Sequence, residues 1–439
     1  MDGAKTGRAG ERWYLSFFFS KMAGGASSPL VPLFVIAVLG GGVAAVSLAV
    51  VSVSVATVPA FILWGEYTDR NRRRRLPLVL GMAMTAISFV VMGLAEGLGL
   101  FIAGNVIYGF FLAATVPTST VLIMEHNPEP EWGRAVGRFT KVNGMGWMLG
   151  MVMGVVWFAA LPSDVPVEVA MRTFMLVCGL LSAVAYAMAM VWIEEPRVHY
   201  DRRWLADELV ALRSWTFERA RYIPTRLVFT TKPRVIRKAR RFLPGWGRDL
   251  DIYLASTLVL FTGITVFYVP FPVMLAEELF LDSAQIFIVY LASAVMAAFM
   301  YTWAGKEVDS LGNRKAQLMA WGVRALVFPS FSAALLLYSW GYGWAAFALV
   351  TSLNGVTGAF FSIVSVAGIT TALDLSPRRG KGEAVGAYNA VTGVGTILGG
   401  LAGGLIASTA GYYAVAFTTG CLSVVAIALL LRVRFPTIT

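Results

Sequence analysis

Twelve uninterrupted apolar stretches run through this chain of 439 residues, and each is long enough to form a helix across a lipid bilayer. About 20 apolar residues span the roughly 30 Å hydrocarbon core of a membrane. The chain is 57% hydrophobic and 14% charged, with a mean hydropathy of +0.70, a composition atypical of soluble globular domains. We therefore expect an all-α integral membrane protein. Its twelve transmembrane helices are predicted at 13–39, 43–64, 76–96, 98–124, 138–160, 170–193, 250–276, 283–304, 316–338, 342–372, 386–408 and 411–432.

The second half of the chain repeats the first. Residues 134–150, RAVGRFTKVNGMGWMLG, align with residues 383–399, EAVGAYNAVTGVGTILG, at a constant offset of 249. A second offset of 240 aligns GEYTDRNRRRR at 65–75 with GKEVDSLGNRK at 305–315. This duplication predicts two similar halves. The expected domains are an N-terminal six-helix bundle at 1–193, a linker at 194–248 and a C-terminal six-helix bundle at 249–439.

Basic residues lie on alternate connections between the spans, as the positive-inside rule describes for cytoplasmic loops. The opposite connections carry acids, with Arg172 as the exception. We therefore expect a multi-pass protein of the cell membrane with both termini in the cytoplasm. The basic residues behind this orientation are Arg8, Arg12, Arg70, Arg72, Arg73, Arg74, Arg75, Arg134, Arg138, Lys306, Arg314, Lys315, Arg378, Arg379 and Lys381.

The linker at 194–248 holds most of the net charge of the chain. It contains 14 Lys and Arg against six Asp and Glu, a surplus of eight within the total of +11. Nucleic acid would suit such a charge, but the membrane context favours anionic lipid head groups as the partner. We expect the linker to lie on the cytoplasmic leaflet and to bind no nucleic acid.

The sequence contains no recognisable catalytic or metal-binding constellation. Cys178 and Cys421 fall within predicted spans, and His126 and His199 fall in predicted cytoplasmic segments. These residues do not form a cluster with metal-ligand spacing, and neither a Gly-x-Ser-x-Gly nor a phosphate-binding Gly-x-x-x-x-Gly-Lys motif is present. We therefore expect a protein that is not an enzyme and that uses no cofactor and no metal.

The sequence combines twelve spans in two parallel repeats, a basic central linker and a Gly-x-x-x-Asp-Arg motif at 65–70. The motif is partly repeated at 305–309. In these features the chain resembles the major facilitator superfamily. The resemblance implies two six-helix bundles related by a pseudo-twofold axis along the membrane normal. It also implies a central cavity that opens to each side of the membrane in turn.

The loop that carries this motif is expected to act as a conformational latch. Gly65 lets another helix approach closely, and Asp69 can accept hydrogen bonds from the N-terminus of a facing helix. Arg70 and Arg74 are positioned to pair with Glu125 at the cytoplasmic end of the fourth span. The alternative is that the basic run only sets topology, which we prefer for the other arginines of the loop. The latch residues are Gly65, Asp69, Arg70, Arg74, Glu125, Gly305, Asp309, Arg314 and Asp374.

Glycines recur every four residues in the fifth and eleventh spans, at Gly146, Gly150, Gly154, Gly395, Gly399 and Gly403. This spacing places them on one helix face, where two backbones can pack closely. They form either ordinary close packing or a sliding interface between the bundles.

Two departures weaken a drug–proton antiporter assignment. Gly150 is followed by Met151 where such antiporters have proline, and the stretch from Asn105 to Gly109 lacks their arginine.

The resemblance also implies that spans 1, 4, 7 and 10 line the pathway. Lys21 lies about 12 Å into the first span at 1.5 Å per residue, either as a cation on the cavity wall or as a side chain snorkelling to the cytoplasm. Asn105 and Asn354 either form hydrogen bonds between neighbouring helices or line the cavity. Arg324 is expected to pair with Asp309 or Asp374. The candidate substrate-binding residues are Phe17, Phe18, Lys21, Asn105, Tyr108, Phe261, Tyr268 and Asn354.

We therefore predict a monomeric secondary active transporter that moves a small amphipathic organic compound by alternating access. The compound is expected to be an anion if Lys21 faces the cavity. Efflux is the preferred direction, and coupling to protons stays open. The alternatives are an uptake uniporter or symporter for an organic anion, and a membrane sensor or lipid-handling scaffold that does not transport.

Overall fold

The computed structural model describes residues 12–71, 73–127, 132–162, 164–195, 247–376 and 381–435, and the long regular elements within them are helices. The helices coincide with the predicted apolar stretches. In lipid each backbone N–H and C=O needs a partner, and a helix supplies these partners within one segment. The helices are α1 (Tyr14–Ala37), α2 (Val43–Asn71), α3 (Arg75–Gly93), α4 (Leu98–His126), α5 (Trp132–Ala159), α6 (Val167–Trp192), α9 (Arg248–Tyr268), α10 (Phe271–Glu277), α11 (Ser283–Leu311), α12 (Asn313–Ser339), α13 (Gly343–Asp374) and α14 (Lys381–Leu431).

Two of the predicted spans are interrupted or fused. The seventh is divided between α9 and α10 at Pro270, which has no backbone N–H to continue a helix. The last two are fused in α14, whose residue Gly411 has a φ of +80°. This is the left-handed region that glycine tolerates, so α14 turns there and contains two crossings.

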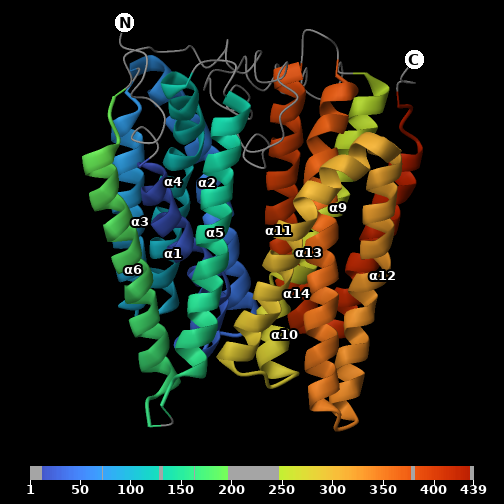
Figure 1. Cartoon of the computed structure of the whole chain (residues 1–439). Coiled ribbons are helices and arrows are strands. Elements are labelled where there is room, and N and C mark those ends of the chain that lie inside the picture. Colours follow the sequence, from blue (N-terminus) through green and yellow to red (C-terminus); the bar gives the residue numbers. More distant parts are fainter. Residues whose placement is uncertain are drawn as a thin grey trace, which may run out of the picture.

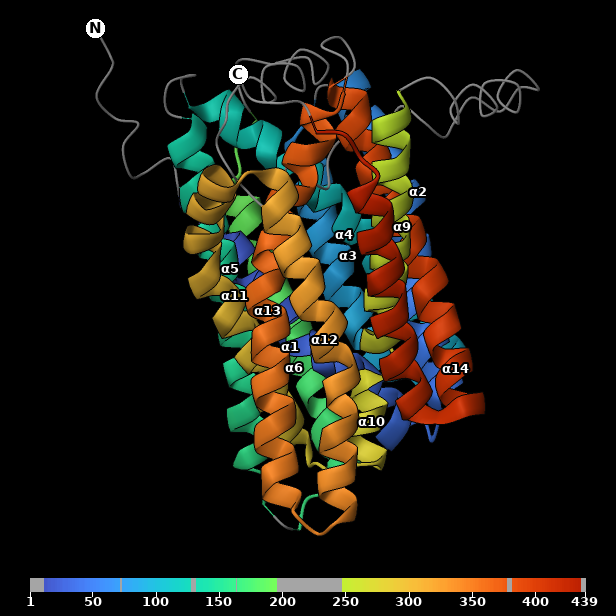
Figure 2. The ribbon, with the colours of Figure 1, turned by 90° about the vertical axis from the view of Figure 1, so that its right-hand side faces the viewer.

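The helices form two groups, α1–α6 and α9–α14, that stand side by side, and α1 begins at the same end of the molecule as α14 finishes (Figure 1). Figure 2 shows the second group from its outer side, with the bend in α14 at the opposite end. The prediction of an all-α fold with two six-helix bundles is confirmed. Apart from 194–195 and 247–248, the predicted linker lies outside the described residues, so its lipid contacts stay a prediction.

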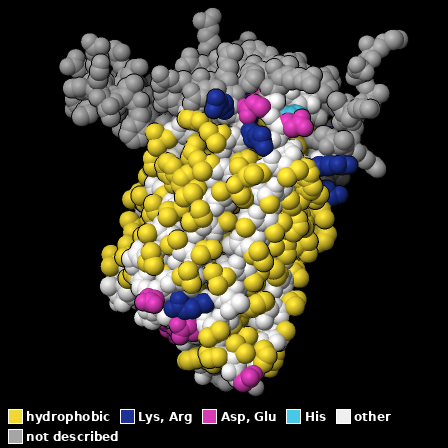
Figure 3. Space-filling model, turned by 90° about the vertical axis from the view of Figure 1, so that its left-hand side faces the viewer, with side chains coloured by type: hydrophobic (Ala, Val, Ile, Leu, Met, Phe, Trp, Pro, Cys, Tyr) yellow, Lys and Arg dark blue, Asp and Glu magenta, His cyan; other side chains and the backbone are white. Residues whose placement is uncertain are grey.

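The outer surface suits a membrane. On the face drawn in Figure 3, hydrophobic side chains cover the middle of the molecule and charged side chains gather at its two ends. Ten helical stretches of the described chain are long and apolar enough to cross a bilayer. α1 falls outside that set, because Lys21 and several serines, glycines and prolines lower its hydropathy.

Five of the six glycines in the two stripes pack inside their own bundle. A Cβ on Gly150 would lie 2.0 Å from the Met22 carbonyl oxygen of α1, and one on Gly399 would lie 2.2 Å from the Thr262 carbonyl oxygen of α9. The helices therefore meet backbone to backbone, with no room for a side chain. The same kind of contact recurs at Gly146, Gly395 and Gly403. For these glycines the close-packing alternative describes the structure, and a sliding contact between the bundles does not.

The sixth stripe glycine, Gly154, lies in the seam between the bundles, where α2 packs along α14 and α5 packs along α11, so for Gly154 a sliding contact stays a prediction. A Cβ on Gly404 would lie 2.6 Å from the Ser47 Cβ, and a Cβ on Gly154 would lie 2.0 Å from a ring carbon of Phe287. The Phe287 ring also lies 5.5 Å from the ring of Phe158. These residues lie near the end of the molecule opposite to the start of α1, so the bundles are closed against each other there.

Arg172, the exception in the charge pattern, forms hydrogen bonds at the C-terminal end of α3. Its Nη1 donates to the carbonyls of Gly93 at 3.1 Å and Ala95 at 2.8 Å. Its guanidinium lies 5.5 Å from the ring centroid of Phe34. A cation is favourable at the C-terminus of α3, where unpaired carbonyls carry partial negative charge. The position of Arg172 therefore has a local structural reason.

Candidate substrate-binding cavity

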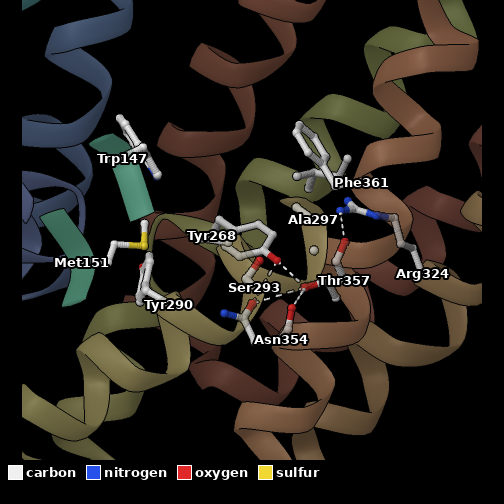
Figure 4. Close-up of a pocket in the computed structure, with 13 residues that line it drawn as sticks. Trp147, Met151, Tyr268, Tyr290, Ser293, Ala297, Arg324, Asn354, Thr357 and Phe361 are labelled. Carbon is white, nitrogen blue, oxygen red and sulfur yellow. Dashed lines mark hydrogen bonds between the residues drawn. The ribbon is translucent and has the colours of Figure 1, made fainter. Parts of the chain in front are cut away.

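A cavity of about 300 Å³ lies between the two bundles. Small-molecule sites commonly enclose about 300–1,000 Å³, so this volume suits a small organic compound. α5 forms one wall, and α9, α11, α12 and α13 form the other (Figure 4). The lining residues are Trp147, Met151, Ile264, Tyr268, Tyr290, Ser293, Ala294, Ala297, Arg324, Asn354, Thr357, Gly358 and Phe361.

Three polar side chains on the wall formed by the second bundle are joined in one hydrogen-bond network. The Tyr268 hydroxyl donates to Asn354 Oδ1 at 3.1 Å and lies 2.6 Å from Thr357 Oγ1. Asn354 Nδ2 donates to the Val289 carbonyl at 2.8 Å. The amide of Asn354 thus ties α13 to α9 and α11 and also lines the cavity, so it has both of the roles expected for it.

Arg324 of α12 reaches this network from the side. Its Nη2 donates to the Thr357 carbonyl at 2.8 Å, and its guanidinium lies 5.3 Å from the ring centroid of Phe361 and 5.7 Å from that of Phe328. The residue is 1% exposed. Nε and Nη1 have no hydrogen-bond partner among the described residues. Figure 4 shows the guanidinium extending toward Thr357 and Phe361.

The pairing predicted for Arg324 is wrong in the case of Asp374. Arg324 contacts Thr357, which lies about 25 Å from Asp374 along α13 at 1.5 Å per residue. Asp374 instead accepts a hydrogen bond from Asn313 Nδ2 at 2.6 Å. The side chain of Asp309, the other predicted partner, lies outside the described residues. The helix rotation that points Arg324 inward could not be read from its sequence neighbours.

The opposite wall is apolar. Trp147 and Met151 of α5 face the cavity one helical turn apart, across from Arg324 in Figure 4. The wall formed by the second bundle adds further apolar side chains to the cavity, from Ile264, Tyr290 and Phe361. The cavity therefore offers hydrogen bonds and a positive charge from one bundle and mainly apolar contact from the other.

Two of the eight predicted substrate-binding residues, Tyr268 and Asn354, line this cavity. The Asn105 amide donates to the Phe101 carbonyl of its own helix at 3.2 Å, unlike its counterpart Asn354. The ring of Phe17 packs 4.8 Å from that of Phe139 in a separate buried cluster. The other six predicted residues are not among the residues that line the cavity, and their contact with substrate stays a prediction. They are Phe17, Phe18, Lys21, Asn105, Tyr108 and Phe261.

The ion pair expected in the latch is present. Arg74 Nη2 lies 3.0 Å from Glu125 Oε1, with both side chains buried. Glu195, which the sequence did not single out, accepts hydrogen bonds from the backbone N–H groups of Arg74 and Arg75 and so caps α3. Arg314 donates to the Leu431 carbonyl at 3.1 Å. The structure does not describe the surroundings of the remaining latch residues, so the latch function stays a prediction. These residues are Gly65, Asp69, Arg70, Gly305 and Asp309.

The sequence profile described as the Major Facilitator Superfamily matches residues 13–357, most of the chain. The chain belongs to the Major Facilitator Superfamily. Among curated proteins, this major facilitator protein is similar to the multi-drug resistance efflux pump PmrA of Streptococcus pneumoniae. The two are 23% identical over 431 residues, which cover 92% of this chain and 91% of the relative.

Solved structures of transporters share the fold. A point mutant of the nucleoside transporter NupG matches with a TM-score of 0.69 at 13% identity, covering 97% of this chain and 99% of that one. A bacterial homolog of the human lysosomal transporter Spinster, inward-facing and unoccupied, matches with a TM-score of 0.62 at 13% identity, with 98% of each chain covered. The human organic anion transporter MFSD10 matches with a TM-score of 0.55 at 16% identity, covering 96% of this chain and 99% of that one. These likenesses show the fold, and membership of the Major Facilitator Superfamily makes the chain a membrane transporter and not an enzyme.

Proposed function

We propose that this protein is a secondary active transporter that exports a small amphipathic organic compound by alternating access. The observation that carries the proposal is the cavity between the bundles, with hydrogen-bonding groups on one wall and the apolar side chains of Trp147 and Met151 on the other. A compound with one polar end and one apolar end satisfies both walls. The similarity to a multi-drug efflux pump supports export as the direction.

The proposed orientation follows from the charges of the connections. Basic loops and both termini are placed in the cytoplasm of the cell by the positive-inside rule. The seam at Ser47, Gly404 and Phe287 then lies toward the outer face. We infer that the cavity opens toward the cytoplasm while this seam is closed, which is the state that would load a compound for export.

Transport into everted membrane vesicles tests this proposal, because export then appears as accumulation inside the vesicle. The panel is 2-naphthalenesulfonate, the neutral 2-naphthalenesulfonamide and the cationic 2-naphthylmethylammonium, three compounds with one ring system and different charge. We expect accumulation of at least one of them above that in vesicles without the protein. Accumulation only in right-side-out vesicles would indicate uptake, and no flux in either preparation would favour a non-transporting scaffold.

The same assay addresses energy coupling and assembly. Repeating it with nigericin in potassium medium tests proton coupling, because potassium–proton exchange collapses the pH gradient and leaves the membrane potential in place. An exporter that depends on the pH gradient then loses accumulation. We propose that the monomer is the functional unit, because both walls of the cavity come from one chain. Light scattering of the purified protein in detergent checks this state, and a stable dimer would contradict it.

A further inference from the structure

The cavity wall carries the positive charge of Arg324, which would have no role in binding if the exported compound were neutral. The side chain is 1% exposed, and two of its three guanidinium nitrogens have no hydrogen-bond partner among the described residues. A buried cation is costly unless an opposite charge or a ligand accompanies it. Buried polar groups are ordinarily satisfied, so unused donors at a cavity wall mark a place where a ligand can supply the missing acceptors.

The guanidinium is held in place before any ligand arrives. The Thr357 carbonyl accepts one of its five N–H donors, and the rings of Phe361 and Phe328 lie within 6 Å of its carbon. Cation–π contacts of this kind attract the cation without consuming an N–H group. Arg324 therefore holds two nitrogens without an acceptor in a fixed geometry that favours binding of a planar or tetrahedral oxyanion. Both nitrogens are enclosed in this state of the protein, so an oxyanion reaches them after a small movement of the surrounding side chains.

The rest of the lining neither repels nor neutralises an anion. Among the described lining residues, Arg324 is the one side chain that carries a formal charge at neutral pH. The network of Tyr268, Asn354 and Thr357 offers neutral dipoles beside it. On the facing wall, Trp147 and Met151 provide an apolar surface.

We infer that Arg324 is the anion-binding residue of the transport site, and that the exported compound is an amphipathic organic anion. Its sulfonate, carboxylate or phosphate group contacts Arg324, and its apolar body lies against Trp147 and Met151. This assignment rests on the proposed transport function, and it replaces Lys21, which does not line the cavity, as the reason to expect an anion.

A binding experiment separates this inference from transport itself. Equilibrium dialysis of the purified protein compares 2-naphthalenesulfonate with 2-naphthalenesulfonamide, which keeps the ring and loses the charge. A charge-assisted hydrogen bond supports at least about a tenfold preference for the sulfonate. We expect that preference in the parent protein, its loss in Arg324→Gln, and partial retention in Arg324→Lys, which keeps the charge but not the planar donor set.

The control variant is Lys315→Gln, which removes an exposed cation of the same helix, α12, that is not among the cavity-lining residues and should leave the preference unchanged. Size-exclusion profiles and thermal melting show whether each variant is folded. An Arg324→Gln protein that fails to fold would leave Arg324→Lys and the parent preference as the deciding measurements. An equal affinity of the parent for sulfonate and sulfonamide, or an unchanged preference in folded Arg324→Gln, would overturn the inference. Preserved binding without vesicle transport would instead reject the proposed function.

Discussion

Gly404 and Ser47 face each other across the seam between the two bundles, and a Cβ built on Gly404 would lie 2.6 Å from the Cβ of Ser47. Alternating access requires such a contact to open when the cavity turns to the other side. The proximity makes these two positions a means of holding the seam closed.

Cross-linking these two positions is expected to stop transport reversibly. Disulfide formation needs Cβ atoms about 3.5–4.5 Å apart, a spacing that a small shift of the helices provides. In a Ser47→Cys/Gly404→Cys protein with Cys421 replaced by serine, oxidation should abolish vesicle accumulation and a reductant should restore it. The single-cysteine variants are the controls. Full transport by a protein shown to be cross-linked would mean that the seam does not open.

Alanine substitutions in α5 should separate the packed glycines from the open ones. Gly150→Ala places a Cβ 2.0 Å from the Met22 carbonyl oxygen, whereas a Cβ on Gly144 meets nothing within 4 Å. Gly144→Ala should raise stability by up to about 1 kcal/mol, the usual difference in helix propensity. Gly150→Ala should lower it by about 1–3 kcal/mol, as overpacking does. Thermal melting in detergent measures both, and equal melting temperatures would contradict the backbone contact of α1 with α5.

Replacing Arg324 with methionine is expected to stabilise the ligand-free protein while removing anion binding. The substitution takes away a buried cation that has no counter-ion among the described lining residues, and removing buried charges in favour of apolar side chains is often neutral or stabilising by about 1–4 kcal/mol. Adding 2-naphthalenesulfonate should raise the melting temperature of the parent, because ligands stabilise the state they bind. It should not raise that of Arg324→Met. A large loss of stability in this variant would show that the guanidinium has mainly a structural role.

The ion pair of Arg74 and Glu125 should behave as a coupled unit. Both side chains are buried, and removing one partner of a buried pair commonly costs about 3–5 kcal/mol because the other charge is left alone. Arg74→Gln and Glu125→Gln should each destabilise the protein strongly, and the double variant by less than the sum. Arg73→Gln, at an exposed position of the same loop, should have little effect. Additive effects in a double-mutant cycle would argue against direct coupling.

Membrane potential is expected to drive export of the sulfonate in the absence of a pH gradient. Arg324 remains part of the protein, so each transported anion moves one net charge across the membrane. A potential of 100 mV contributes about 2.3 kcal/mol per charge. A potassium gradient with valinomycin, set negative on the cytoplasmic side, should accelerate sulfonate flux and leave sulfonamide flux unchanged. Dependence on a pH gradient alone would indicate that a proton compensates the charge.

The helices were predictable because membrane insertion selects for long apolar segments, and each predicted span has a helix at the matching residues. The duplication likewise predicted the two bundles. Four-residue spacing predicted that Gly150 and Gly399 share a helix face with their neighbours, but not which helix that face meets. Periodicity defines a face, whereas its partner depends on how all of the helices are arranged.

The cavity was predictable only in part. Tyr268 and Asn354 line it as expected, because their spans are central in the fold. The sequence predicts a carboxylate partner for Arg324 and gives no signal for Trp147. A charged residue deep within a span was the available signal for Arg324, since such residues commonly serve function. The sequence did not reveal that the side chain turns toward the cavity.

The division of the cavity walls has a kinetic consequence for the return step of the cycle. Arg324 belongs to one bundle, and Trp147 and Met151 belong to the other. When the bundles rock together without cargo, a desolvated cation must approach an apolar surface, whereas a bound anion neutralises that cation before the walls meet. The loaded carrier should therefore reorient faster than the empty one, so exchange of labelled for unlabelled sulfonate across the membrane should outpace net flux. In such a cycle the substrate acts as the counter-ion of its own carrier.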